Sequence, residues 1–362
     1  MQIRTQSPIF KQRNFLSVRK PSGFTLIEFM VASALALVVL LAIGVTYGIT
    51  SNMRNASENR LAAQQDLRNA AELLLRDAQM AGSFGCFNMG NLLNKQMPVS
   101  PNSSTGFHSA ATGVRLILND PDYSGISIMD NNDAKHVLNV AGFQPTANSP
   151  VLVFSYGQNL TPVTGSGPHT ATGVTQELLN TASSNGPVAL SSCARMYIGN
   201  GSALNVDAGR QTITINNSFG GSLVSNFSSA GSFYLPQTTL SQVQSVAYAV
   251  GRIPNANTAD ALYRFTLTPN GTWGNPQLMA ANIQSMQVKQ LYAGCNNSST
   301  DVTFSNDRST LANLPNVTRI SMLPAIVEVR LQLTENQKTY GSVTQYLIRA
   351  NVRGGNVCAN QS

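Results

Sequence analysis

Gly23-Phe24-Thr25-Leu26-Ile27-Glu28 sets the architecture of this chain, because it joins a basic leader to a long apolar run. The apolar run from Phe29 to Ile49 is long enough to span a bilayer. Glu28 places a lone carboxylate at the start of this segment, where hydrocarbon makes a charge costly unless another group neutralises it. The leader contains no acidic residue and carries Arg4, Lys11, Arg13, Arg19 and Lys20.

An uncleaved signal anchor or a secretory signal peptide is the ordinary explanation of such an N-terminus. A secretory signal has a small-residue cleavage site after its apolar core, whereas here a glycine precedes the core. The run is also too long for the core of a signal peptide. Basic residues on the leader side predict that the chain beyond the apolar run lies outside the cytoplasm.

The composition suits an extracytoplasmic, β-rich surface better than a cytosolic enzyme. Charged residues make up only 11% of the 362 residues, against about a quarter in typical soluble proteins. Five of the 23 lysines and arginines lie in residues 1–23, so the chain from Phe24 carries 18 basic residues against 16 acidic ones. This balance provides no basic patch for nucleic acid, and we expect no direct binding of DNA.

Four cysteines follow the apolar run: Cys86, Cys193, Cys295 and Cys358. Their spacing contains no C-x-x-C pair, which disfavours a zinc ribbon or a thioredoxin-type motif. In an oxidising compartment two disulfides are expected, and three connectivities are possible. We favour Cys86–Cys193 with Cys295–Cys358, because each bond then stays within one half of the globular region.

The N-terminal region predicts one long helix without proline from about residue 24 to residue 80. After the apolar part, small and apolar residues recur at spacings of three or four, which is the pattern of an amphipathic helix. These are Ala63, Leu67, Ala70, Leu74, Ala78 and Ala81. The intervening charged residues are expected to face water or neighbours, and they are Arg60, Asp66, Arg68, Glu72, Arg76 and Asp77. Gly44 and Gly48 weaken helix locally, which predicts either a segment that melts on assembly or close helix packing.

The rest of the chain predicts strands with long loops. The clearest strand is 326–333, where Val327, Val329 and Leu331 alternate with charged residues. Such alternation is typical of an antiparallel sheet with one solvated face. Further strands are expected at 114–118, 151–155, 212–215, 246–250, 263–267, 286–289 and 343–352, and loops at 97–113 and 156–190. The fold class is therefore α+β, with a long N-terminal helix packed on a β-rich antiparallel domain.

The box Gly23 to Glu28 resembles the class III signal of type IV prepilins. This resemblance implies that a prepilin peptidase cuts after Gly23 and that Phe24 is then N-methylated. It also implies that Glu28 pairs with the α-amino group of Phe24 in an adjoining subunit of the filament. The expected parts are a leader at 1–23, a helix at 24–82 that spans the membrane over about 24–49, and a globular domain at 83–362.

Several short segments after the cleavage box resemble segments of the PilW-type minor pilins, and they follow one another in the same order. The similar stretches are 75–86, which ends in Gly82-Ser83-Phe84-Gly85-Cys86, and 247–251, 261–264, 281–288 and 346–353. The resemblance implies an inner-membrane protein with a periplasmic domain that later joins the pilus on the cell surface. Its expected partners are the prepilin peptidase, the major pilin, other minor pilins and the assembly platform of the inner membrane. A type II secretion pseudopilin and a tip adhesin that uses the predicted loops are the alternatives.

No constellation of residues predicts catalysis, so we expect neither an enzyme nor a cofactor. Residues 120–125 are similar to the start of a calcium loop, but its twelfth position is Asn131 and not the required glutamate, which favours a solvated turn. His108, His136 and His169 stand alone in apparently loop-like sequence, at spacings that fit no metal motif. Arg330, Arg349, Arg353 and Lys289 are expected to be ordinary sheet surface.

Overall fold

The computed structural model describes most of the chain after the leader. The described residues are 23, 25–89, 107–109, 114–116, 125–165, 168–193, 195–216, 219, 223–224, 233–254, 259–296, 301–321, 323–334, 343–355 and 358. The chain divides into two units, residues 1–57 and residues 58–362.

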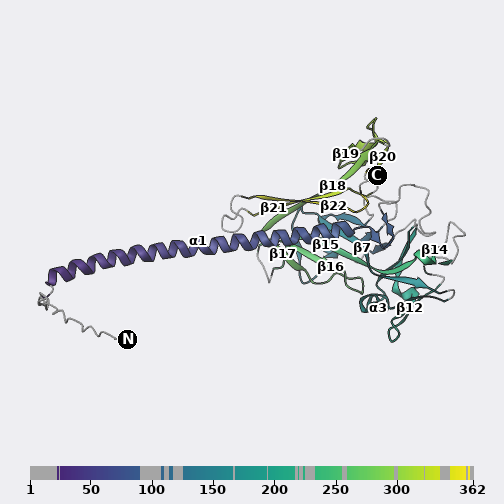
Figure 1. Ribbon diagram of the computed structural model, residues 1–362, viewed down its shortest axis with the longest axis horizontal. Helices are drawn as coiled ribbons and strands as arrows, with labels where there is room; N and C mark the ends of the chain where they lie inside the picture. The colour runs from purple at the N-terminus through teal and green to yellow at the C-terminus, as the bar shows by residue number, and fades with distance from the viewer. Residues whose placement is uncertain are drawn as a thin grey trace, which may run out of the picture. The chain divides into compact units, whose positions relative to one another are not determined.

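Helix α1 (Leu26–Met80) runs from the first unit into the second (Figure 1). It begins two residues after the predicted start, and it continues through Gly44 and Gly48. In the first unit its large hydrophobic side chains, from Leu26 to Met53, are exposed. By length and composition α1 is able to cross a membrane.

Within the second unit, α1 buries one face. The residues buried are Ala63, Leu67, Ala70, Ala71, Leu74, Asp77 and Ala78. Spacings of three and four place them on one side of the helix, so the predicted amphipathic pattern is confirmed. Most of them are alanines.

Glycines allow the chain to turn at the end of α1. Gly82 has a φ of 72°, and its N–H donates a hydrogen bond to the carbonyl of Ser155 at 2.9 Å. Gly125, with a φ of 90°, lies directly against Gly82, and a Cβ at position 125 would collide with the Gly82 backbone. The chain then forms a small hairpin of β1 (Ser83–Phe84) and β2 (Phe87–Asn88).

The larger sheet has the strand order β10-β9-β15-β7-β8-β12-β11, with β5, β6, β16 and β17 attached beside this path. Its strands are β5 (Ile126–Met129), β6 (Gln144–Pro145), β7 (Val151–Thr164), β8 (His169–Thr172), β9 (Pro187–Ser192), β10 (Arg195–Asn200), β11 (Leu204–Asp207), β12 (Thr212–Ile215), β15 (Thr239–Arg252), β16 (Ala261–Thr266) and β17 (Gln277–Ala281). All of their pairings are antiparallel.

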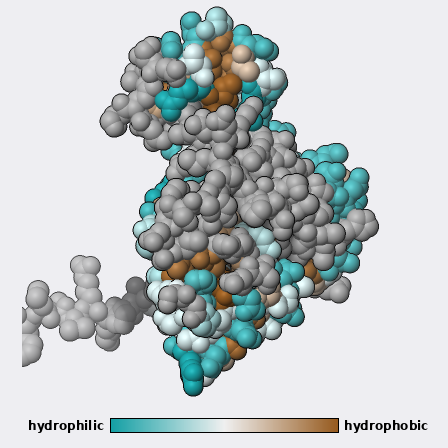
Figure 2. Space-filling view, turned by 90° about the vertical axis from the view of Figure 1, so that its right-hand side faces the viewer, coloured by the Kyte–Doolittle hydropathy of each residue, from teal (hydrophilic) through white to brown (hydrophobic). Residues whose placement is uncertain are grey.

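The second sheet has the order β19-β18-β21-β22, with β20 paired to β18. Its strands are β18 (Ile283–Cys295), β19 (Val302–Ser305), β20 (Arg319–Ile320), β21 (Ile326–Leu333) and β22 (Gln345–Asn351). Strand β21 coincides with the strand predicted at 326–333. Figure 2 shows hydrophobic atoms among hydrophilic ones at the upper end, where β19 and β20 lie, and Phe304 and Leu314 are exposed in this region.

Short elements complete the fold. They are the helices α2 (Asn131–Val137), α3 (Gln176–Ser183) and α4 (Arg308–Ala312), the 3-10 turns η2 (Gly201–Ala203) and η3 (Leu235–Gln237), and the strand pairs β3 (Phe107–Ser109) with β4 (Val114–Leu116) and β13 (Leu223–Val224) with β14 (Phe233–Tyr234). One hydrophobic core joins α1 to both sheets, and a smaller one surrounds α3.

The prediction of a loop over 156–190 was wrong. This stretch forms the second half of β7, then β8, α3 and most of β9. Strand β9 is buried along its whole length although it ends in Ser191-Ser192, so it shows no alternation of polar and apolar residues. The expected loop at 97–113 lies largely outside the described residues, apart from 107–109, which form β3.

Candidate processing and assembly site

The start of α1 is closed by a reciprocal pair of hydrogen bonds between Thr25 and Glu28. The Glu28 N–H donates to Oγ1 of Thr25 at 3.4 Å, and Oε2 of Glu28 accepts from the Thr25 N–H at 3.0 Å and from its hydroxyl at 2.9 Å. This is a capping box, which satisfies donors that have no partner within the helix. The carboxylate that the sequence predicts to act in assembly thus caps the first turn of the helix.

The cleavage position lies immediately before this cap. Gly23 is exposed, and an added Cβ there would meet no neighbouring atom within 4 Å. Phe24 lies outside the described residues. The described atoms around Gly23 thus leave space at the predicted cleavage position.

Asp77, near the end of α1, was predicted to face water or neighbours, and this was wrong. Its side chain is only 3% exposed and forms an ion pair of 3.0 Å with Nη2 of Arg264 on β16. Nε of Arg264 also donates to the same carboxylate oxygen at 3.2 Å. The Tyr248 hydroxyl on β15 donates to Oδ2 of Asp77 at 2.7 Å, and the Tyr156 hydroxyl on β7 donates to Oδ1 at 3.2 Å.

This Asp77 cluster, formed by Asp77, Tyr156, Tyr248 and Arg264, connects α1 to three strands of the larger sheet. Burial and the neighbouring Asp77 charge both raise the pKa of Tyr248 and of Tyr156. Burial lowers the pKa of Arg264, but Asp77 and Tyr248 more than reverse this effect, so its pKa is raised. Asp77 thus accepts hydrogen bonds from neutral tyrosines and a charged arginine, which compensates for the loss of its hydration.

One sequence signal pointed to this cluster. Asp77 falls three residues after Leu74 and one before Ala78, which places it within the apolar stripe of the helix. Its partners lie at least 79 residues away in the chain, and no local pattern links them to it. Tyr248 faces Arg264 across the β15–β16 ladder, in the hairpin formed by the segments at 247–251 and 261–264.

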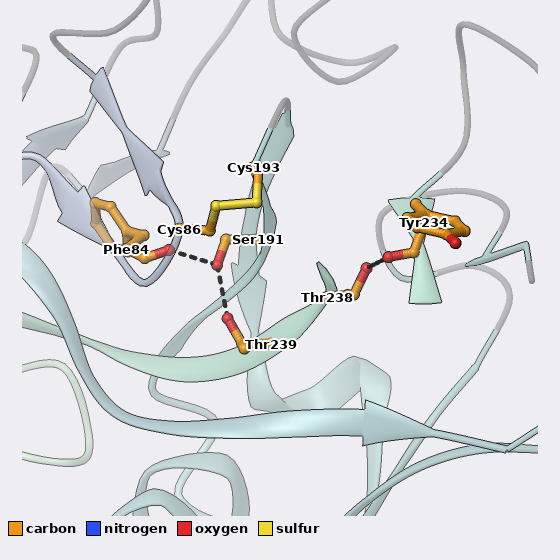
Figure 3. The surroundings of a disulfide bond; sticks show 7 residues. All are labelled: Phe84, Cys86, Ser191, Cys193, Tyr234, Thr238 and Thr239. Atoms are coloured by element: carbon orange, nitrogen blue, oxygen red, sulfur yellow. Dashed lines mark hydrogen bonds between the residues drawn. A yellow bond between two sulfur atoms is a disulfide. The ribbon is translucent and has the colours of Figure 1, made fainter. Parts of the chain in front are cut away.

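Two disulfides join the cysteines singled out from the sequence. Cys86 is bonded to Cys193 and Cys295 to Cys358, with Cα–Cα distances of 4.6 and 6.0 Å. Figure 3 shows Ser191 beside the first bond, where its hydroxyl donates to the Phe84 carbonyl at 2.7 Å. The segment that follows α1 is thereby fixed to β9 by a covalent bond and a hydrogen bond.

The remaining candidates form no site. Arg349 and Arg330 both pair with Glu328, at 3.0 and 3.5 Å, on the surface of the second sheet. Asp130 accepts from the N–H of Asp133 and caps α2, and most of the calcium-like stretch lies outside the described residues. The three histidines were wrongly placed in loops: the structure places them in β3, α2 and β8. Within the described part of the chain, no three His, Cys, Asp or Glu side chains gather around a possible metal position.

Residues 18–44 match the model of the prokaryotic N-terminal methylation motif. No curated protein matches the chain, and no solved structure matches it. The matched segment contains the cleavage box, the cap of α1 and much of its apolar half. The chain is therefore a prepilin with a class III signal peptide, a pilin- or pseudopilin-like protein anchored by its N-terminal apolar helix. Proteins of this kind are processed by a prepilin peptidase, enter pilus-type assemblies and are generally structural, not enzymatic.

Proposed function

We propose that this prepilin is a minor pilin of the PilW type, which acts in the initiation and assembly of type IV pili. The observation that carries the proposal is the size of the second unit, residues 58–362, on a chain that bears the methylation motif. A unit this large is difficult to repeat along a thin fibre. It therefore favours a low-copy place in a priming or tip complex, in support of twitching motility, adhesion or DNA uptake.

Processing removes residues 1–23 by cleavage between Gly23 and Phe24, and the new amine of Phe24 is methylated. The exposed Gly23 next to a capped helix supports this position. Before assembly the protein lies in the inner membrane, with its globular part in the periplasm. Assembly then transfers α1 from the membrane into the helical bundle of the filament on the cell surface.

Glu28 sets the axial register of the subunit in that bundle. Among the described residues of the single chain, Thr25 is the hydrogen-bond partner of its carboxylate. Among packed apolar helices an unpaired carboxylate is costly, and in this proposal the amine of Phe24 in an adjoining subunit neutralises it. The partners in this step are the major pilin, other minor pilins and the assembly platform.

Pilus number in a clean deletion strain, with and without the retraction motor, tests this function. We expect surface pili to disappear in the single deletion and to return when retraction is also blocked, because a priming protein promotes initiation against retraction. Normal pili in the single deletion would contradict the assembly role. Loss of type II secretion in that strain would then identify a pseudopilin, and loss of adhesion alone would identify a tip adhesin.

A further inference from the structure

Strand β15 changes its partner on one edge. Its other edge pairs with β7 along most of its length. On the first edge, residues 239–242 pair with β9 and residues 246–251 pair with β16. Residues 243–245 lie between these two partners, and a cavity of about 400 Å³ opens here. This volume falls in the range of sites for small ligands.

The cavity is lined by amide, hydroxyl and carboxylate groups from three elements. These groups belong to Gln158 and Asn159 of β7, Glu177 and Thr181 of α3, and Gln242 and Gln244 of β15. A turn at 267–269, directly after β16, closes one side and contributes apolar surface with Val243. No lysine or arginine is among the described lining residues, so these residues offer no positive charge to an anionic ligand.

Two of these amides are buried and incompletely hydrogen-bonded. Gln242 and Gln244 are each 8% exposed. The Oε1 atom of Gln242 lies 3.1 Å from the Thr181 hydroxyl, and Nε2 of Gln244 donates to the Ser245 carbonyl at 3.2 Å. Within the described residues, the second amide atom of each has no hydrogen-bond partner. Neither atom is among the fully buried polar atoms that lack a partner, so both keep contact with solvent and are open to a polar ligand.

The backbone around the cavity holds these groups in place. Gln158 pairs with Gln242 next to a register shift of the β7–β15 ladder, where Asn159 has a φ of 56°. Such bulges redirect side chains and are frequent next to binding sites. Gly186 lies so close to the carbonyl of Pro269, a lining residue, that an added Cβ would collide with it.

We propose that this amide cavity binds a neutral carbohydrate, such as the terminal one or two sugars of a glycan. An amide offers a donor and an acceptor side by side, which suits neighbouring hydroxyl groups, and Glu177 accepts from a further hydroxyl. The apolar surface of Val243 and Leu267 suits the C–H face of a sugar ring. This inference goes beyond the proposed assembly function and does not depend on it.

Binding of sugars to the full chain in detergent tests the proposal. The probes are glucose, galactose, mannose, N-acetylglucosamine and lactose, measured by saturation-transfer-difference NMR followed by calorimetric titration. We expect saturable binding of at least one probe. Loss of one amide hydrogen bond in Gln242→Met or Gln244→Met should weaken this binding about tenfold. The exposed Gln287→Met on β18, outside the cavity, should leave the affinity unchanged.

Glu177→Gln provides a second arm, because Glu177 is exposed and its replacement should not disturb folding. We expect this variant to weaken binding of the same sugar several-fold while its thermal midpoint stays unchanged. The proposal is wrong if none of the five sugars binds, or if binding survives all three cavity substitutions. Equal binding of heparin, a polyanion, would also contradict it. These results are independent of pilus counts, so they separate this inference from the assembly role.

Discussion

Asp77 of the N-terminal helix and Tyr248 of β15 are 171 residues apart in the chain, yet the tyrosine hydroxyl donates to the carboxylate at 2.7 Å. Arg264 contacts the same oxygen of Asp77. This buried junction fixes the rotation of the helix against the sheet, because a shift of one residue would turn the carboxylate away from all three partners. It is also the feature from which the first two predictions follow.

Asp77→Ala should destabilise the second unit by about 3–5 kcal/mol, because it leaves the charge of Arg264 without its buried partner. Urea unfolding of the full chain in detergent, followed by circular dichroism, measures this change. Asp66→Ala, at an exposed position of the same helix, is the matched control and should change the stability by less than about 0.5 kcal/mol. Equal effects of the two substitutions would show that the cluster contributes nothing specific.

Stability should fall as the pH rises above about 10. The pKa values of Tyr156 and Tyr248 are raised in the folded protein above their ordinary value of 10.0. Above that pH the unfolded chain releases the tyrosine protons while the folded chain keeps them, so alkaline conditions favour unfolding. The stabilisation that these two tyrosines contribute is fully present below pH 10 and is lost as the pH rises further. Denaturation midpoints measured between pH 8 and pH 11 give the slope of stability against pH.

The double variant Tyr156→Phe, Tyr248→Phe should have a shallower alkaline slope than the parent chain, because it lacks both shifted groups. Tyr346→Phe on β22 is the control and should keep the parent slope. If the double variant loses stability above pH 10 as steeply as the parent, other groups account for the alkaline unfolding.

The two disulfides should differ in their access to reductant. Cys86 and Cys193 are exposed, whereas Cys295 and Cys358 are buried. Dithiothreitol under native conditions should therefore open Cys86–Cys193 first. Alkylation at successive times and mass spectrometry of the peptides give the order. Simultaneous opening of both bonds would contradict this prediction, and the same peptides check the connectivity.

Removal of the first disulfide by Cys86→Ser with Cys193→Ser should lower the stability by about 2–4 kcal/mol, because the bond closes a long loop in the unfolded chain. The residue separation of this loop is 107. Thermal unfolding of the full chain measures the loss, with the unreduced parent as reference. An unchanged midpoint would show that the hydrogen bond from Ser191 to Phe84 is sufficient to hold this segment.

Substitutions at the N-terminus should separate processing from assembly. Gly23→Val should block cleavage, because the peptidase requires the glycine, and an immunoblot should show only the longer precursor. Glu28→Gln should be cleaved normally but be lost from sheared pili, since it cannot pair with the amine of Phe24. Gly44→Ala serves as the control for the apolar helix. Normal incorporation of Glu28→Gln would contradict the proposed register.

Local patterns predicted α1 and β21 well, but they found only part of each of the longest strands, β7, β15 and β18. Helix α1 lacks proline and repeats its small residues every three or four positions, and β21 alternates strictly, so both were visible in the sequence. Strand β15 extends from Thr239 to Arg252, but alternation revealed only 246–250. Its earlier residues are buried on both faces and include serines and glutamines that bond to other elements. A strand cannot be predicted from alternating polar and apolar residues where its polar side chains are buried and hydrogen-bonded inside the sheet.

The candidate site likewise has a part that a local motif predicts and a part that depends on strand pairing. Gly23 and Glu28 lie within one short motif, so their types and spacing are sufficient to predict a role for each. The Asp77 cluster depends on the pairing of β7, β15 and β16, which no local pattern specifies. The cavity beside β15 likewise arises because two strands share one edge, a property of topology and not of any single segment.

The bond between Cys86 and Cys193 has a mechanical consequence for a protein whose helix is held in a fibre. Tension along α1 reaches the second unit first through the buried face of the helix and the Asp77 cluster. Six residues after the helix ends, Cys86 adds a covalent crosslink to Cys193, directly after β9. Strand β9 pairs with β15 in the middle of the larger sheet. If the packing of the helix yields under load, this crosslink still carries the pull into the larger sheet and keeps the first hairpin from peeling away.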